Sequence, residues 1–121
     1  MKYLCLGYRD RAKMDAVPAP EMKAILRTWV SSVQELNQCS GTLLHHALQR
    51  DVTTLRASRG EITVTDGPCG ETREEIASFF VIEARDLNEA IRVASLHPSA
   101  RMGEDLGWRI EIRAVGEFKP D

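Results

Sequence analysis

The turn Asp66-Gly67-Pro68 holds the carboxylate with the clearest chemical options in this sequence. Asp can accept hydrogen bonds from the amides that follow it, Gly permits unusual backbone angles and Pro fixes φ, so these residues favour a tight turn in any case. A tight turn can also present Asp66 at the mouth of a cleft, where a carboxylate acts as a general base or orients a histidine. The sequence leaves both interpretations open, a structural one and a catalytic one.

Glu71, in the acidic stretch after this turn, is the second candidate acid. A charge-rich stretch next to a buried strand is usually a solvated surface. If Glu71 instead points back at the turn and shares a site with Asp66, repulsion between the two carboxylates raises the pKa of one carboxyl group and makes it a usable acid. We therefore take Asp66 and Glu71 as candidate catalytic residues.

His97 directly precedes Pro98, whose ring disfavours helix at the preceding residue, so we place His97 at the C-terminus of a helix. A surface histidine in that position interacts favourably with the helix dipole when it is charged. If the loop 99–107 folds over a cleft, His97 could instead shuttle protons to a substrate, and Arg101 could bind a substrate carboxylate in bidentate fashion. His97 is our third catalytic candidate, and Arg101 is a ligand-binding candidate.

His45 and His46 are adjacent, so on a strand their side chains face opposite sides and at most one of them lines a given site. Metal sites need ligands that converge on one point, and two neighbouring histidines with Asp66 do not have that spacing. We predict neither a metal site nor a cofactor. Tyr8, at the end of the first apolar segment, is either part of the core or a ligand-binding residue that donates a hydrogen bond.

The elements that position these residues can be predicted from hydrophobic periodicity and turn chemistry. The best-defined helix follows Pro18 and Pro20, because its apolar residues recur at three- and four-residue steps. A second helix starts at Asp86, which with Glu89 resembles a capping box. In chain order we predict a strand at Lys2–Tyr8, a helix ending near Cys39, a strand at Thr42–Leu48, a hairpin of Val52–Ala57 and Glu61–Thr65, a strand at Ile76–Glu83, the helix from Asp86 to before Pro98, and a strand at Gly107–Val115.

The predicted strand Ile76–Glu83 has apolar residues on both of its faces, which indicates a central strand covered on both sides. The order of elements contains two βαβ-like halves. We therefore predict an α+β fold, a ferredoxin-like antiparallel sheet with two helices on one face. Since two helices cover only one face, we expect a second copy of the chain to cover the other face in a homodimer.

The composition fits one globular domain over residues 1–121, with 43% hydrophobic and 28% charged residues. The net charge of -2, with no run of Lys or Arg longer than two residues, argues against a nucleic-acid partner. No segment resembles a signal peptide or a membrane span. The three cysteines are far apart, odd in number and without a C-x-x-C motif, which argues against a disulfide framework and favours a reducing, cytoplasmic location.

Several segments also carry a family likeness: Thr65-Asp66-Gly67-Pro68, Glu71-Thr72-Arg73-Glu74, the apolar strand after them, Asp86-Leu87 through Ala90, and the ending Ile110-Glu111-Ile112-Arg113. Together they resemble the YCII-related domain family, in its DGPF-motif branch. The resemblance covers nearly the whole chain. It implies a dimeric ferredoxin-like α/β barrel with a cleft between the sheet and the partner subunit.

The resemblance also implies functions. Relatives of this type are suspected of enzymatic work through a His/Asp pair, one of them is a dehydrochlorinase, and members of the DGPF branch often accompany extracytoplasmic-function sigma factors. His46 stands where the family frequently has a carboxylate, and we choose it as a ligand-binding candidate for that reason. The chain departs from the motif at Cys69, where Phe is usual, and no His/Asp pair is transferred to it.

Our leading hypothesis is a homodimer whose interfacial cleft, bounded by Asp66, Glu71, His97 and His46, binds a small polar or aromatic molecule. The carboxylates and the imidazole in such a cleft could perform acid/base chemistry such as elimination, as in a lyase or a dehydrochlorinase. The alternative is a non-enzymatic module that binds a transcription regulator, such as a sigma factor, through a sheet edge or the acidic stretch. The sequence leaves open whether the chain is an enzyme.

Overall fold

The computed structural model describes residues 1–67 and 73–117 of the 121-residue chain. In these ranges the strands are β1 (Lys2–Asp10), β2 (Thr42–Ala47), β3 (Thr53–Ser58), β4 (Glu61–Asp66), β5 (Glu74–Glu83) and β6 (Arg109–Ala114). The helices are α1 (Arg11–Asp15), α2 (Ala19–Gln38), α3 (Leu87–Ala94), α4 (Pro98–Arg101) and the 3₁₀ helix η1 (Glu104–Leu106). None of these helices is long and apolar enough to cross a membrane.

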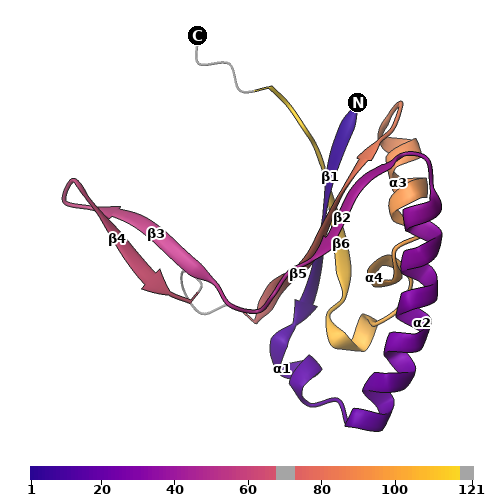
Figure 1. The fold of residues 1–121 in the computed structure, drawn as a ribbon, viewed down its shortest axis with the longest axis horizontal. Helices are drawn as coiled ribbons and strands as arrows, with labels where there is room; N and C mark the ends of the chain where they lie inside the picture. The colour runs from indigo at the N-terminus through magenta and orange to yellow at the C-terminus, as the bar shows by residue number, and fades with distance from the viewer. Residues whose placement is uncertain (68–72, 118–121) are drawn as a thin grey trace.

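β1, β2, β5 and β6 form a four-stranded sheet of order β2-β5-β1-β6. Every neighbouring pair of strands in this sheet is antiparallel. The strand order and directions are those of a ferredoxin-like fold, and α2, α3 and α4 lie on one side of the sheet (Figure 1). The predicted α+β fold is confirmed, with β5 as a central strand.

The start of α3 shows how local chemistry sets the boundaries of the elements. The Asp86 carboxylate accepts a hydrogen bond from the Glu89 N–H at 2.9 Å, and the Glu89 carboxylate accepts one from the Arg85 N–H at 3.1 Å. Amides near a helix start have no partner within the helix, so these two bonds satisfy groups that would otherwise be unpaired. The predicted helix start at Asp86 is therefore confirmed.

The core lies between the sheet and the helices. It consists of buried side chains from β1, β5, α2 and α3: Tyr3, Cys5, Leu36, Phe80, Ile82, Ala90 and Ala94. Because Cys5 is surrounded by these apolar groups, burial raises the pKa of its thiol to about 12. The core therefore uses one face of the sheet only.

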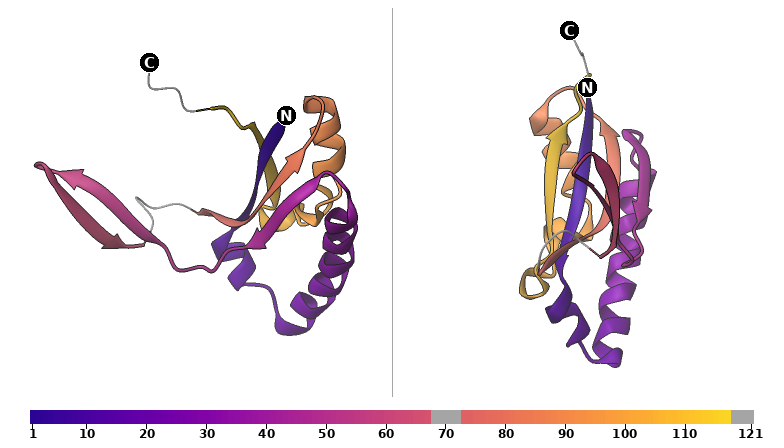
Figure 2. Two further views of the ribbon diagram at one scale, coloured as in Figure 1. Left: turned by 45° about the horizontal axis from the view of Figure 1, so that its top comes forward. Right: turned by 90° about the vertical axis from the view of Figure 1, so that its left-hand side faces the viewer.

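The opposite side of the sheet, which we call the open face, carries the alternate residues of the strands: Leu4, Leu6, Leu44, His46, Phe79 and Val81. None of these side chains is fully buried. In the right-hand view of Figure 2 the strands face the viewer and the helices lie behind them. Within the described ranges, no helix covers this largely apolar surface.

β3 and β4 form a separate two-stranded hairpin, which we call the arm (residues 53–66). Arg59 and Gly60 at its tip have positive φ angles of 53° and 79°, as the central residues of a type I′ turn do. The arm projects away from the other described residues, which we call the body, on the side of the sheet opposite to α2 and α3 (Figure 1). The predicted hairpin is confirmed, but it forms no part of the main sheet.

Candidate functional site

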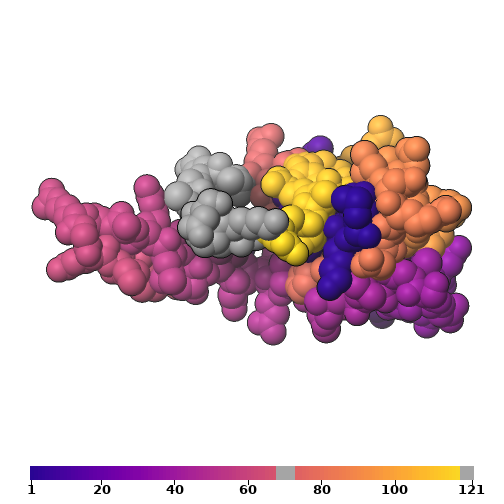
Figure 3. Space-filling model, turned by 90° about the horizontal axis from the view of Figure 1, so that it is seen from above, coloured from indigo at the N-terminus to yellow at the C-terminus, as the bar shows by residue number. Residues whose placement is uncertain are grey.

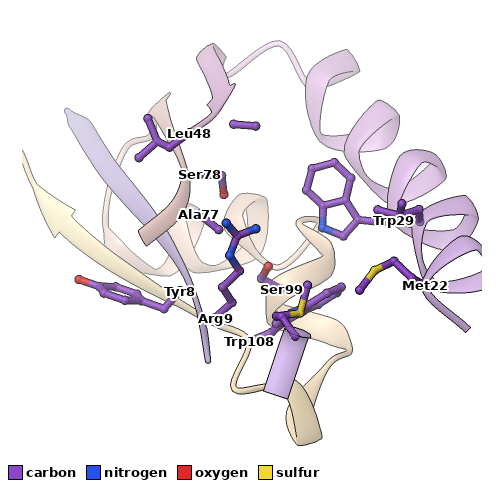
Figure 4. A pocket seen from close by; sticks show the side chains of 12 residues that line it. Tyr8, Arg9, Met22, Trp29, Leu48, Ala77, Ser78, Ser99 and Trp108 are labelled. Carbon is purple, nitrogen blue, oxygen red and sulfur yellow. The ribbon is translucent and has the colours of Figure 1, made fainter. Parts of the chain in front are cut away.

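A pocket of about 190 Å³ lies between α2, the end of the sheet and the segment around Ser99 and Trp108 (Figure 4). Its apolar lining includes Met14, Met22, Leu26, Trp29, Leu48 and Trp108. Arg9, Ser78 and Ser99 are its main polar groups. We call this cavity the tryptophan pocket, because it has an indole on two of its sides.

Trp108 is held in place by the tight turn that precedes it. Gly103 has a φ of 76° and lies against the indole so closely that a Cβ atom at this position would overlap the ring. The Trp108 N–H donates to the Gly103 carbonyl at 3.1 Å, and the indole Nε1–H donates to Met14 Sδ at 3.2 Å. The turn and α1 thus fix one wall of the pocket.

Arg9 is the charged side chain in the lining of the tryptophan pocket. Its Nε donates to Glu75 Oε1 at 2.7 Å, and the two side chains are only 21% and 18% exposed. Arg50 Nε lies 3.4 Å from the same oxygen. Figure 4 shows the guanidinium end of Arg9 within the cavity, and its terminal nitrogens make no hydrogen bond to a described residue. Arg9 therefore has N–H donors left for a ligand.

Ser78 and Ser99 add hydroxyl groups to this polar corner of the pocket. Figure 4 shows both side chains bordering the cavity near the Arg9 guanidinium. Ser78 lies on the central strand β5, and Ser99 lies in α4, so the sheet and a helix both contribute. A guanidinium with two nearby hydroxyls is an arrangement suited to a carboxylate or another oxygen-rich group.

His97 is buried behind this pocket. Its ring stacks on Phe80 at a centroid distance of 5.2 Å and makes edge contacts with Trp29 at 5.8 Å and His45 at 5.3 Å. The ring nitrogen Nδ1 accepts the Ser99 N–H at 3.0 Å, so the proton of the neutral ring is on Nε2. Burial, and then the neighbouring His45, lowers the pKa of His97 from 6.5 to about 4.

The predicted position of His97 at a helix C-terminus is wrong. α3 ends at Ala94, and His97 is instead the N-cap of α4, which starts at Pro98. Proline suits the first position of a helix as well as the position after the end of a helix. For Pro98 the prediction assumed the position after a helix, whereas the structure has it at the start of α4. The alternative of an exposed histidine is also wrong, because the side chain is fully buried and neutral at pH 7.

The other candidates lie on separate surfaces. Asp66 is exposed at the end of the arm and lines an open hollow of about 610 Å³ together with Arg11 and Arg50. His46 is on the open face, where its ring contacts Phe79 at a centroid distance of 5.9 Å. Glu71 lies outside the described residues.

Tyr8 and Arg101 already have partners within the chain. The Tyr8 hydroxyl donates to Glu111 Oε1 at 3.2 Å, and the Arg109 guanidinium lies 4.1 Å from the centre of the Tyr8 ring. Burial, and then the Glu111 carboxylate, raises the pKa of Tyr8. Arg101 Nη1 lies 3.5 Å from Glu35 Oε2 in an exposed ion pair.

The structure therefore brings few of the predicted site residues together. Tyr8 lines the tryptophan pocket and His97 lies directly behind it, whereas Asp66 and His46 are on other surfaces of the chain. The catalytic and ligand-binding roles of these residues stay predictions. Within residues 1–67 and 73–117, no three His, Cys, Asp or Glu side chains converge as metal ligands would.

Four residues of the pocket lining were not predicted as site residues from the sequence: Arg9, Ser78, Ser99 and Trp108. Arg9 can be identified as a site residue only from its ion pair with Glu75, which is 66 residues away in the sequence. The wall formed by Trp108 depends on the positive φ of Gly103. A glycine five residues before a tryptophan was the available signal, but it does not by itself distinguish a turn from a pocket wall.

Sequence comparisons with known proteins cover nearly the whole chain. The sequence profile described as the YCII-related domain matches residues 1–119. "Uncharacterized protein R00369" of Rhizobium meliloti (strain 1021) is 32% identical over 123 residues, which cover 99% of this chain and 96% of that protein. The name of this relative assigns it no activity.

Proposed function

We propose that the tryptophan pocket of this chain, which belongs to the YCII-related domain family, binds a small aromatic molecule that carries an anionic group. The family resemblance seen in the sequence is thus confirmed. The observation that carries this proposal is the meeting of two indoles and the free end of Arg9 in one cavity. Apolar walls with a few converging polar groups are typical of small-molecule sites. The assignment to the DGPF branch stays a prediction.

The size of the tryptophan pocket limits the ligand. Its volume is about 190 Å³, and an apolar cavity of roughly 150 Å³ is known to hold one benzene molecule. One aromatic ring with a short substituent therefore fits. Trp29 and Trp108 offer apolar surface to such a ring, and Arg9, Ser78 and Ser99 offer polar groups in the same cavity.

The electrostatics of Arg9 favour an anionic substituent. Its pairing with Glu75 uses Nε, which leaves the two terminal nitrogens to bind a carboxylate in bidentate fashion. Glu75 also lies 3.4 Å from Arg50 Nε, and Arg50 Nη1 in turn pairs with Asp15 at 2.9 Å, so the charges around Glu75 are balanced within the chain. A ligand carboxylate would meet the two terminal nitrogens of Arg9 without needing to displace Glu75.

Acid/base chemistry such as elimination is a finer part of the hypothesis and needs a base near the ligand. The described lining of the tryptophan pocket contains no carboxylate or imidazole. Glu75 is linked to the lining through Arg9, and His97 is separated from it by the Trp29 ring. We therefore propose ligand binding as the function, with Glu75 as the residue to substitute if a turnover is found.

Benzoate is a suitable first probe for this proposal, because it is one ring with one carboxylate. Both tryptophans of the chain line the pocket, so their fluorescence reports directly on binding. We expect saturable quenching by benzoate or its one-ring analogues, and an affinity about tenfold to a hundredfold weaker in Arg9→Gln. Benzyl alcohol, which lacks the charge, should bind the two proteins equally.

The matched control is Arg92→Gln, which removes an exposed arginine of α3 outside the pocket lining. The double variant Arg9→Gln/Glu75→Gln also removes the Glu75 carboxylate, which the single variant leaves with Arg50 as its partner. Equal affinity of benzoate for the Arg9 and Arg92 variants would refute the role of Arg9. Failure of all one-ring carboxylates to bind would refute the proposal as a whole.

We further propose that a second copy of the chain covers the open face. The support is the row of apolar side chains on β1, β5 and β2, among them Leu6, Leu44, Phe79 and Val81, that no described helix covers. Sedimentation velocity should show a dimer at micromolar concentration, which Leu44→Glu weakens and Arg92→Glu does not. A wild-type protein that sediments only as a monomer would exclude the homodimer.

Two further expectations stay predictions. The described thiols Cys5 and Cys39 are free, which supports a reducing compartment and hence the cytoplasm. The alternative function, an interaction module for a transcription regulator such as a sigma factor, has no specific feature in its favour on the described surface. The tryptophan pocket is therefore the stronger basis for a functional assignment.

A further inference from the structure

The arm has one apolar and one polar face. Its cross-strand pairs Leu55↔Val64 and Ala57↔Ile62 lie on one face, and the pairs between them carry Thr, Arg, Ser and Glu on the other. Leu55, Ile62 and Val64 are 65%, 75% and 68% exposed. The sequence thus alternates as in a half-buried sheet, while the apolar half remains in contact with solvent.

Nothing in the body supports the arm along its length. Figure 1 and Figure 3 show its outer part standing clear of the body. The bonds near its base, from the Gly67 N–H to the Val52 carbonyl and from the Thr54 hydroxyl to the Gly67 carbonyl, join the two ends of the hairpin to each other. An isolated two-stranded hairpin is marginally stable in water, so this ribbon needs a surface to pack on.

We infer that the arm packs its apolar face, formed by Leu55, Ala57, Ile62 and Val64, on a second copy of this chain. This inference rests on the proposed dimer and specifies one of its contacts. The arm leaves the body on the side opposite to α2 and α3, which is the side of the open face (Figure 1, Figure 2). A copy seated on the open face therefore lies beside the arm. Two-fold symmetry then forms the same arm contact twice.

The charged residues of the open face are paired within the chain, so the part of this face that lacks a partner is the apolar part. At one edge of the sheet, β6 presents Arg109, Glu111 and Arg113, which form ion pairs with one another and with Glu74. The apolar part of the face lies on β2, β5 and β1, and it adjoins this charged edge where Leu4 and Leu6 pair with Arg113 and Glu111. The Leu48 N–H donates to the Ala77 carbonyl at 2.8 Å, which continues the pairing of β2 and β5 toward the arm. The arm thus follows directly from the end of the sheet at which β2 and β5 are paired.

A pair of double variants on β4 tests the inference. Ile62→Glu/Val64→Glu places two carboxylates on the apolar face of the arm, and Thr63→Glu/Thr65→Glu places two on the polar face of the same strand. In sedimentation velocity the first variant should raise the dimer dissociation constant about a hundredfold or more, because four apolar contacts per dimer are lost. The second variant should dimerise as the wild type does.

Hydrogen exchange of the arm amides gives an independent measurement. In the wild type, exchange over residues 53–66 should slow as the protein concentration rises through the dissociation constant, and in the Ile62→Glu/Val64→Glu variant it should stay fast. The milder change Ile62→Ser keeps the test informative if the double variant folds poorly. Unchanged tryptophan fluorescence in either variant shows that the body is intact.

Each result decides for or against the inference. Wild-type dimerisation of Ile62→Glu/Val64→Glu would overturn the arm contact and leave the dimer through the open face standing. A monomeric wild type with fast arm exchange would overturn both, and would point to a different partner for the arm. Arm protection that does not depend on concentration would mean that the arm folds onto its own body, which also overturns the inference. None of these results bears on benzoate binding in the tryptophan pocket.

Discussion

The main sheet and the arm share an alternating pattern of apolar and polar residues but differ in what lies on the apolar face. Under α2 and α3, the β5 residues Phe80 and Ile82 are fully buried. On the arm, Ile62 and Val64 are mostly exposed. An amphipathic strand is one half of an interface, and the other half need not come from the same chain. The difference explains why alternation predicts strands well and predicts their packing partners poorly.

Two substitutions by alanine should give the largest difference in unfolding free energy between the body and the arm. Phe80→Ala removes a buried ring from the core and should lower the free energy of unfolding by about 3–5 kcal/mol. Ile62→Ala at high dilution should cost about 0.5 kcal/mol or less, because the side chain is 75% exposed. Urea unfolding at the lowest practical protein concentration measures both.

Raising the protein concentration sharpens this comparison. If the arm packs on a second copy, the cost of Ile62→Ala grows with concentration, whereas the cost of Phe80→Ala does not depend on the arm contact. A large cost of Ile62→Ala at high dilution would contradict the described difference between the two regions, since it would require the arm to pack on its own body.

Much of the fold could be predicted because its signals are local. The spacing of apolar residues in α2, the cap at Asp86 and the turn at Arg59-Gly60 each act over a few residues. The ferredoxin-like order then follows from the order of the elements. The arm was predicted as a hairpin for the same reason, and its separation from the sheet was not, because that depends on long-range pairing.

The pocket was harder to predict because its contacts join distant residues. Arg9 has a partner at Glu75, and Trp29 meets Trp108 across the cavity. Chemical type singles out Asp66 and the family resemblance singles out His46, and the fold places these residues on an exposed hairpin and on the open face. Chemical type identifies groups that can react, but only packing decides which of them share a cavity.

We expect His97, a residue of the body, to make the stability of the protein depend on pH. In the unfolded chain the imidazole takes up a proton near pH 6.5, and in the folded chain only near pH 4, because burial disfavours the charged form. The unfolded state therefore binds more protons between these values. The contribution is present in full above pH 6.5 and is lost as the pH falls toward 4, by about 3 kcal/mol in total.

The measurement is the free energy of unfolding at several pH values from 7 down to about 4. His97→Phe should remove most of the loss of unfolding free energy that protonation of His97 causes. It should leave the loss that protonation of carboxylates causes. The arm variant Ile62→Ala removes no titratable group and should keep the wild-type pH dependence. An unchanged slope in His97→Phe would contradict the assignment of a buried, neutral imidazole.

The smallest expected difference compares two glycines, one in each region. Gly103 and Gly60 have nearly the same positive φ, 76° and 79°, so replacement by alanine carries a similar conformational cost of about 1 kcal/mol at both positions. A Cβ atom at Gly60 meets nothing within 4 Å, whereas at Gly103 it would overlap the Trp108 indole. Gly103→Ala should therefore cost about 1–3 kcal/mol more in urea unfolding and should also shift tryptophan emission. Equal costs would mean that the wall of the tryptophan pocket relaxes as freely as the tip of the arm, and the pocket would then lack the fixed shape on which selective ligand binding depends.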